Sequence, residues 1–578
     1  MRKHLKNIII LALTLSVTVG FSQNKKSDTL STGVINVVKP YVPTISEAFK
    51  VRENPSLDDK TTQTKKEIKY NIFSFPVEST FTPAKGNAAA VEKKASAKLF
   101  DNYASLGVGN YTTVLGDLYL NHTISRNKSV GGYISHHSSQ GGIKGLAFND
   151  SFLNSKVEAN YSSRSRYLAW NLEGGYQQQL YHWYGVPESK IAEAKASNID
   201  VKHSFYNAHF GADFTFNDTY INSGRFFFRH FGDHQDSAEN RFVAKAKVDI
   251  PINDVEISTA FKIDYLKGSF KRSYLTTDAI SYSNFQIGIS PSYQFKQDDL
   301  TLNIGVSGVY LNDGEAGENT FYIYPNLSVA YPLVSDLLIV YGGAKGGLIQ
   351  NSYYGFAKDN PFVSPTLYMQ PTNQIYNAFV GLKGKFSSSI SYNINGRYLA
   401  DKNKALYSVN RVQNALVKNS YHYGNSFGVV YDDVNTLKIS GEINVDVNQN
   451  FKLGVKGEYF NYTVTNETEA WNLPDMKATV FLDYQINPKW YAGANLFYVG
   501  ERKDQLATDD VLLAKELVKT VVLEHYLDAN AHLGYYINSK FSVFAKANNI
   551  ANKAYEKWQN TPVQSIQFLA GGTYKFDF

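Results

Sequence analysis

The densest group of reactive side chains in the sequence lies between residues 225 and 236. It contains Arg225, Arg229, His230, Asp233, His234 and Asp236. Imidazole and carboxylate groups are suitable ligands for a divalent cation, so His230, Asp233 and His234 are weak candidates for a metal site. The same residues also fit the solvated end of a strand, which is the simpler interpretation. We therefore predict no metal site and no cofactor.

Hydrolytic chemistry would need a nucleophile or an activated water beside a histidine and an acid. The chain contains serines, histidines and aspartates, but no short spacing forces them into such a triad. It contains no cysteine, which excludes disulfides, thiolate metal sites and a cysteine nucleophile. Phosphate-cradling loops and zinc motifs are not found either. We expect a protein that is not an enzyme.

Polar and apolar residues alternate along most of the chain beyond residue 100, as they do in β-strands. In the segment 436–447 one face carries Leu437, Ile439, Ile443, Val445 and Val447, and the other face is polar or charged. The chain has 42 Tyr and 36 Phe but only 3 Met, a composition that suits strands better than helices. Long strands with one apolar and one charged face are typical of a wall between lipid and water.

The connections between these segments alternate in length. Short turns are expected at 217–218, 251–254, 296–299, 448–450, 487–489 and 538–540, and longer polar loops at 138–152, 185–200, 350–372, 401–423 and 501–523. Short turns at one end and long loops at the other are typical of outer-membrane barrels. The predicted fold class is all-β: a single transmembrane antiparallel β-barrel over residues 100–578, with an even number of strands, roughly 18 to 22.

The first 22 residues look like a cleavable export signal. They have a basic start with Arg2, Lys3 and Lys6, then an apolar core, with a cut expected before Gln23. The core is shorter than the roughly 20 residues that a spanning helix needs. Residues 23–99 are polar and interrupted by prolines, so we expect an extended arm, either periplasmic or lumenal. The predicted location is the bacterial outer membrane.

The last strand, residues 567–578, carries aromatic side chains in one register and ends on an aromatic residue. These side chains are Phe568, Tyr574, Phe576 and Phe578. We interpret them as the signal that the outer-membrane insertion machinery reads. Aromatic residues near other strand ends, such as Trp183, Tyr184 and Trp490, are predicted to form interfacial girdles. A sugar-stacking platform is the alternative for these residues.

The closing strands resemble those of TonB-dependent receptor barrels of the Bacteroidota. The resemblance rests on Phe541–Asn549, Asn552–Trp558 and the final strand, with support from Asp432, Asp433, Glu469–Trp471, Pro474 and Leu527–Asn530. It implies a transport barrel. Receptors of that family carry a plug domain before the barrel, whereas only about 75 residues are available here. We therefore expect a receptor-like barrel without a recognisable plug domain.

A short apolar segment near the start of the arm resembles the segment through which such receptors engage TonB. Its residues include Thr32, Val34, Ile35, Val37 and Val38. An apolar stretch of this length can add as a strand to the edge of a partner's sheet. The alternative is a strand that lies in the lumen or packs on a neighbour.

Two functions remain open on the sequence alone. The first is transport, by a channel or a plugless receptor-like barrel. The second is a non-transporting accessory subunit of an outer-membrane protein assembly or export complex, which docks through its arm and loops. Outer-membrane lipid and the insertion machinery are expected partners in both cases. TonB, surface lipoproteins or other outer-membrane complex subunits are expected in one or the other, and no nucleic acid is expected.

Overall fold

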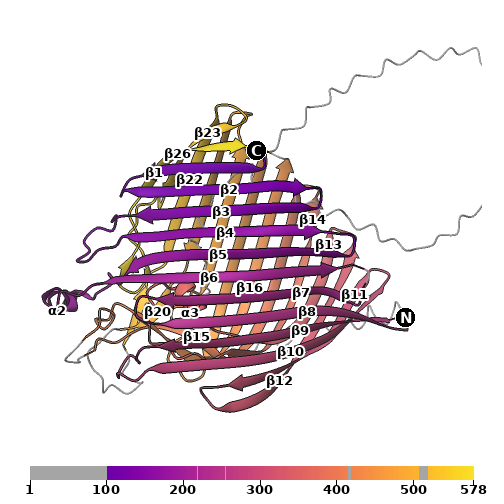
Figure 1. Ribbon diagram of the computed structural model, residues 1–578, viewed down its shortest axis with the longest axis horizontal. Coiled ribbons are helices and arrows are strands. Elements are labelled where there is room, and N and C mark those ends of the chain that lie inside the picture. The colour runs from indigo at the N-terminus through magenta and orange to yellow at the C-terminus, as the bar shows by residue number, and fades with distance from the viewer. Residues whose placement is uncertain (1–99, 218, 254, 414–417, 449, 507–518) are drawn as a thin grey trace, which may run out of the picture.

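A closed antiparallel barrel of 22 strands makes up most of the computed structural model (Figure 1). The structure describes residues 100–578 except 218, 254, 414–417, 449 and 507–518. The predicted export signal, the arm and the TonB-engaging segment therefore lie outside the described residues. Within the described residues, no helix is long and apolar enough to cross a membrane.

The barrel strands follow one another in chain order. They are β1 (Asn102–Gly109), β2 (Thr113–Ser125), β3 (Lys128–Ser139), β4 (Phe152–Arg164), β5 (Leu168–His182), β6 (Lys202–Phe216), β7 (Ile221–Asp233), β8 (Ala238–Ile252), β9 (Val255–Phe270), β10 (Ile280–Gln297), β11 (Leu300–Asp313), β12 (Glu318–Val334), β13 (Leu338–Ile349), β14 (Thr372–Ser387), β15 (Ile390–Val409), β16 (Phe427–Asn448), β17 (Phe451–Val464), β18 (Met476–Gln485), β19 (Trp490–Val499), β22 (Tyr526–Tyr536), β23 (Phe541–Asn548) and β26 (Gln567–Phe576). Each pairs with the next strand in this series, and β1 pairs with β26 to close the ring.

The remaining elements lie in the connections. They are η1 (Glu188–Lys190), α2 (Ile191–Ala196), α3 (Tyr353–Asp359) and two small hairpins, β20 (Arg502–Gln505) with β21 (Thr520–Leu523) and β24 (Glu556–Trp558) with β25 (Thr561–Pro562). The prediction of an all-β barrel with an even strand number is confirmed, at the upper end of the expected range.

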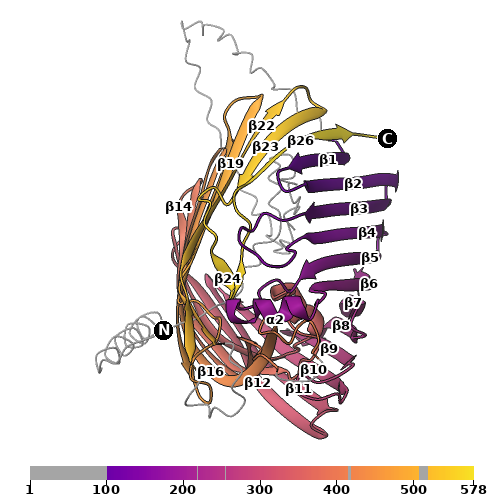
Figure 2. The same ribbon diagram turned by 90° about the vertical axis from the view of Figure 1, so that its left-hand side faces the viewer.

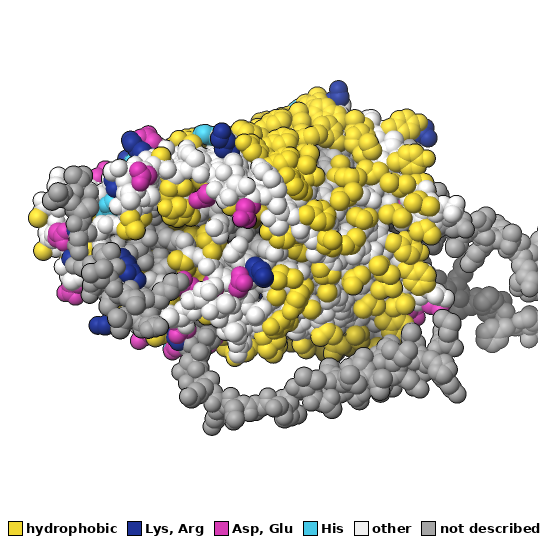
Figure 3. Space-filling model, turned by 90° about the horizontal axis from the view of Figure 1, so that it is seen from below, with side chains coloured by type: hydrophobic (Ala, Val, Ile, Leu, Met, Phe, Trp, Pro, Cys, Tyr) yellow, Lys and Arg dark blue, Asp and Glu magenta, His cyan; other side chains and the backbone are white. Residues whose placement is uncertain are grey.

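Alternation along each strand sorts the side chains onto the two faces of the wall. On β16 the apolar Leu437, Ile439 and Ile443 are exposed on the outer face, whereas Lys438 points into the barrel and forms an ion pair with Glu458 of β17 at 2.7 Å. Figure 3 shows the result on one side of the barrel as a broad band of apolar side chains, with most of the charged side chains gathered at one end.

The two ends of the barrel differ in their connections. One end carries ten turns of two to four residues, and we call it the turn end. The other end, the loop end, carries eleven connections of very different length. The shortest is 110–112 and the longest is 500–525. All the predicted short turns lie at the turn end and all the predicted long loops at the loop end. Several boundaries were wrong. β8 continues through Pro251 and Ile252, β10 continues to Gln297, and β15 continues to Val409, so the predicted loop 401–423 is 410–426.

The chain enters and leaves the barrel at the turn end, on adjacent strands (Figure 1). Asp101 donates its backbone N–H to the Asp577 carboxylate at 3.0 Å, just before β1 begins. The loop end, in contrast, holds the largest buried apolar cluster among the described residues. It faces the viewer in Figure 2, where α2 and β24 lie at the barrel mouth.

Candidate functional site at the loop end

The connection between β13 and β14, residues 350–371, folds back into the barrel mouth, and we call it the cap loop. It carries α3, whose first turn is capped by the Ser352 hydroxyl accepting from Gly355 N–H at 3.0 Å. The buried side chains of the cap loop are mainly apolar and aromatic. They include Tyr353, Phe356, Val363, Leu367 and Met369. The expectation of a polar loop at 350–372 was therefore wrong.

One side of the cap loop packs on strands β6 to β10. Phe205, Phe231, Phe270 and Tyr282 lie on the lumenal face of those strands and are almost fully buried in the same cluster as Tyr353. The Tyr353 ring makes edge-to-face contacts with Phe231 and Phe270, at centroid distances of 5.1 and 4.9 Å. Aromatic pairs in this arrangement add to the free energy gained from burial alone.

Charged side chains of β7 and β8 hold the start of α3. Glu239 is 1% exposed and accepts from Tyr353 N–H at 2.6 Å, Tyr354 N–H at 3.2 Å and the Tyr282 hydroxyl at 2.8 Å. Asp233 accepts from the Tyr353 hydroxyl at 2.6 Å. The Arg229 guanidinium lies over the Tyr354 ring, 3.7 Å from its centroid. Because these groups are shielded from water, each such bond is expensive to lose.

The other side of the cap loop is fixed to β16 and to the connection after β5. Val363 forms an isolated parallel bridge with Phe427, and Ser364 N–H donates to Phe427 O at 2.8 Å. The Trp183 indole N–H donates to Phe362 O at 3.1 Å. Strands β5 and β16 are eleven positions apart in a ring of 22, which places them on opposite walls. The cap loop thus links opposite walls of the mouth.

A second group of buried polar residues surrounds the β20–β21 hairpin. The Asp504 carboxyl is fully buried and accepts from Val409 N–H at 3.0 Å and Gln505 N–H at 2.8 Å. Burial raises its pKa to about 7, although hydrogen bonds from Asn472 and these amides, and the nearby Arg502, oppose the rise. Burial likewise lowers the pKa of Lys557, on β24, to about 8.

The lumenal wall away from the mouth is charged, and many of its charges pair with each other. Arg225 contacts Glu173 at 2.7 Å and Asp213 at 3.1 Å, and Arg241 binds the buried Asp264 through two hydrogen bonds of 2.9 and 2.7 Å. This pairing is what a polar lumen requires, because an unpaired charge in the wall would be costly.

The structure separates the predicted metal candidates. His230 lies on the outer face and pairs with Asn240 through its Nδ1 at 2.9 Å, whereas Asp233 points into the barrel towards Tyr353. His234 follows the strand, and its Nδ1 accepts from Ser204 N–H at 3.2 Å. Among the described residues, no group of three or more histidine, aspartate or glutamate side chains could hold a metal ion.

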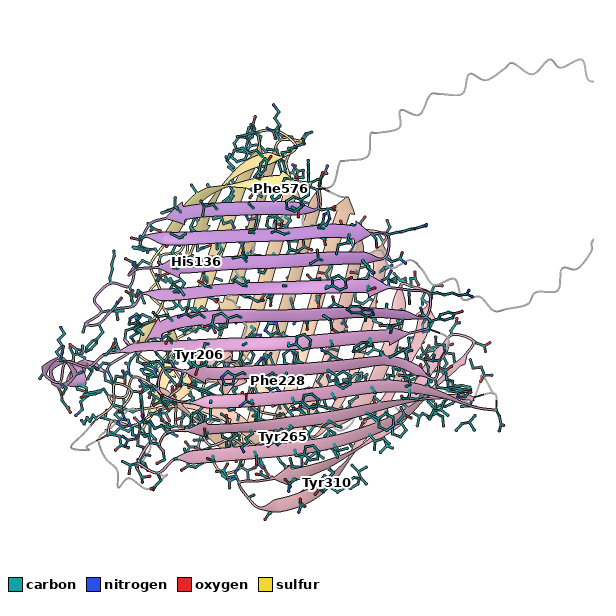
Figure 4. All side chains as sticks on the ribbon, in the orientation of Figure 1. His136, Tyr206, Phe228, Tyr265, Tyr310 and Phe576 are labelled. Carbon is teal, nitrogen blue, oxygen red and sulfur yellow. The ribbon has the colours of Figure 1, made fainter. Side chains whose placement is uncertain are left out.

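The aromatic residues predicted to form girdles divide between the outer face and the buried mouth. Phe228, Tyr265 and Tyr310 are exposed there, as Figure 4 shows with Tyr206, and Trp490 is exposed beside the turn end. Phe568, Tyr574 and Phe578, from the predicted insertion signal, are also exposed, and Figure 4 shows Phe576 on the same strand. Trp183, in contrast, is fully buried in the cap-loop cluster. Tyr184 packs against the same cluster and donates its hydroxyl to Pro562 O at 3.0 Å, so the girdle prediction was wrong for both residues.

One nucleophile pattern escaped the sequence reasoning. Residues 424–428 read Gly-Asn-Ser-Phe-Gly, which matches the G-x-S-x-G form of a nucleophile elbow. That elbow requires a turn from a strand into a helix, but this segment leads from a loop into β16. Ser426 is fully buried, donates to Tyr421 O at 2.8 Å and accepts from Asn410 at 2.8 Å. The serine is a structural anchor of the mouth.

Neither a protein-family profile nor a curated protein matches the chain, but solved structures match its barrel. It is similar to P. aeruginosa FpvA bound to heterologous pyoverdines, with a TM-score of 0.60, 12% identity, and coverage of 82% of this chain and 72% of that chain. It is also similar to the FrpB iron transporter from Neisseria meningitidis, with a TM-score of 0.60, 10% identity, and coverage of 82% and 81%. A third similar structure is the siderophore receptor PirA from Acinetobacter baumannii, with a TM-score of 0.59, 11% identity, and coverage of 84% of this chain and 81% of that chain. At such identities the likeness shows a shared fold, the 22-strand barrel of TonB-dependent siderophore receptors.

Proposed function

We propose that the chain is an outer-membrane transport protein, a barrel of TonB-dependent-receptor architecture that takes up a solute. In this proposal residues 1–22 are the export signal, 23–99 the arm and 100–578 the transmembrane barrel. The segment with Thr32, Val34, Ile35, Val37 and Val38 engages TonB. The observation that carries the proposal is the closed 22-strand barrel that the chain shares with iron and siderophore receptors.

The apolar belt supports a membrane location. On β9 the positions that alternate with the lumenal face are apolar from Val255 to Tyr265 except for the buried Thr259, and the series ends at Lys267. Ten residue steps of about 3.3 Å, on a strand tilted by about 40°, span about 25 Å. Outer-membrane barrels have an apolar band of about that height. In the same proposal the aromatic residues at the end of β26 serve as the insertion signal.

The TonB contact can be tested with one substitution in the arm. Ile35→Pro removes a backbone N–H and disfavours strand pairing, so it should abolish co-purification of TonB from gently solubilised outer membranes. Thr64→Pro, in the same arm but away from the segment, is the matched control and should leave TonB bound. The proposal fails if TonB is missing from the wild-type preparation, or if both variants retain it.

The cap loop favours a second candidate function, an accessory subunit of an outer-membrane assembly or export complex. A loop that links opposite walls through a buried core suits a barrel whose lumen is not a passage. In that case TonB is not needed, and mass spectrometry and native gels of the same preparation should show a stoichiometric large complex. A barrel that is isolated alone, or with only TonB or a surface lipoprotein, would instead favour the transport function.

A further inference from the structure

Closure of the barrel mouth depends on a small number of buried contacts between the cap loop and the wall. The cap loop has no ladder pairing of its own, and its one bridge to a barrel strand is the isolated contact of Val363 with Phe427. On the wall formed by β7 to β10, most of the hydrogen bonds converge on two adjacent residues, Tyr353 and Tyr354, and Gln350 accepts one more from Gln286 of β10 at 2.6 Å. Both of their backbone N–H groups donate to the same carboxylate, that of Glu239.

Glu239 bonds more to the cap loop than to the wall from which it projects. It lies at the loop end of β8, is 1% exposed, and its three bonded partners are two amides of the cap loop and the hydroxyl of Tyr282, which belongs to the same buried cluster. A buried carboxylate is retained only where donors compensate it. Two of the three donors here belong to the cap loop, so the cap loop and Glu239 stabilise each other.

Asp233 and Arg229, both on β7, also contact the two tyrosines of the cap loop. Asp233 takes the Tyr353 hydroxyl and is itself held by Gln235 N–H at 2.8 Å and Ser237 N–H at 3.0 Å, in the turn that leads to β8. Arg229 covers the Tyr354 ring. The contacts therefore form one connected unit, in which displacement of the two tyrosines breaks their bonds to Glu239 and Asp233 together.

We propose that the cap loop closes the half of the mouth that runs from β5 through β10 to β16. Glu239 acts as the latch that holds this closure. Passage through that half requires the Tyr353–Tyr354 pair to leave Glu239 and Asp233, and the apolar face of the cap loop to leave the wall. The closure goes beyond either function proposed above and holds for both, since it concerns access to the lumen and not what the lumen carries.

The chain's lack of cysteine gives a direct test of the latch. Ala357 lies on α3 and is 5% exposed in the cap-loop cluster, so a cysteine there reports on opening. In the purified full-length A357C protein, N-ethylmaleimide modification followed by mass spectrometry should be slow. Adding Glu239→Ala leaves two amides and a hydroxyl without their acceptor, and modification should become at least about tenfold faster. Tyr353→Phe removes only the bond to Asp233 and should give an intermediate rate.

Glu442→Ala in the A357C background is the matched control, because Glu442 also lies on the lumenal face but near the turn end, where it bonds Asn444. It should leave the rate unchanged. A heat-modifiable band in gel electrophoresis shows which variants keep a folded barrel. Equal rates in A357C, its Tyr353→Phe form and its Glu239→Ala form would overturn the latch, as would fast modification of A357C alone. Neither result depends on TonB, so failure here is distinct from failure of the transport proposal.

Discussion

At the residue scale, the loop end concentrates ionisable groups that have lost their water. Asp504 is the clearest of them outside the barrel strands, because its carboxyl is fully buried in the β20–β21 hairpin. Burial raises its pKa from the usual 3.8 to about 7. The acid is therefore harder to ionise in the folded hairpin than in the unfolded chain, and this difference links hairpin stability to pH.

The sign of the pH effect follows from the raised pKa. Below the unfolded pKa of 3.8 the carboxyl is neutral in both states, and the hairpin is at its most stable with respect to this group. As the pH rises towards about 7, the unfolded chain ionises first and the folded hairpin loses stability. We therefore expect hydrogen exchange of the β20 and β21 amides, corrected for the intrinsic rate, to become faster from about pH 4 to about pH 7. These limits are the pKa values of the carboxyl in the unfolded and the folded state.

Asp504→Asn is the variant that isolates this effect. Its amide oxygen can still accept from Val409 and Gln505, but it carries no proton equilibrium, so the pH dependence of exchange should flatten. Asp236→Asn, at an exposed carboxylate that pairs with Lys271, should retain the wild-type slope in β20 and β21. An unchanged slope in Asp504→Asn would mean that another group governs the hairpin.

At the element scale, the seam between β1 and β26 depends on close approach of the two backbones. A Cβ on Gly571 would lie 2.2 Å from Leu106 O and 2.7 Å from the Gly107 Cα, distances that no side chain can occupy without moving the strands. Glycine is thus required by the packing of the seam, not by its backbone dihedrals. The seam matters because it is the pairing that turns a sheet into a ring.

Gly571→Ala should destabilise barrel closure by roughly 1 to 3 kcal/mol, the usual cost of overpacking a tight contact. The expected readout is a lower temperature at which the compact, folded band converts to the unfolded band in gel electrophoresis. Gly441→Ala is the control, since a Cβ there meets nothing within 4 Å. If Gly441→Ala lowers this conversion temperature as much as Gly571→Ala does, glycine is needed for a reason other than contact at the seam.

At the scale of the whole molecule, the barrel closes without the arm. All 22 barrel strands lie between Asn102 and Phe576, and β1 pairs with β26 over eight residue pairs. The pairing that builds the ring is therefore complete within these residues. This makes the arm available for the docking role that both proposed functions assign to it.

Deletion of residues 24–98 should accordingly leave a folded, heat-modifiable barrel in the outer membrane and remove its co-purifying partners. The physical reason is that no strand of the ring is lost, whereas the segment proposed to pair with TonB, or to dock on a complex, is. The measurement is comparative mass spectrometry of the full-length and deleted proteins after gentle solubilisation. Retention of every partner would place docking on the loops, and loss of the folded band would show that the arm stabilises the barrel.

The sequence by itself determined the barrel, because a strand's alternation is local: Lys438 and Ile439 fall on opposite faces wherever their strand lies in the ring. It also determined which end carries the longest loops, since the connections of an antiparallel barrel alternate between its two ends. It could not determine the fate of residues 350–371 or of Trp183. Tyr353 finds Asp233 across 120 positions of sequence, and Trp183 finds Phe362 across 179. Only the closure of the ring brings such residues together, so only the tertiary structure decided that a loop expected to be polar forms the buried core of the mouth.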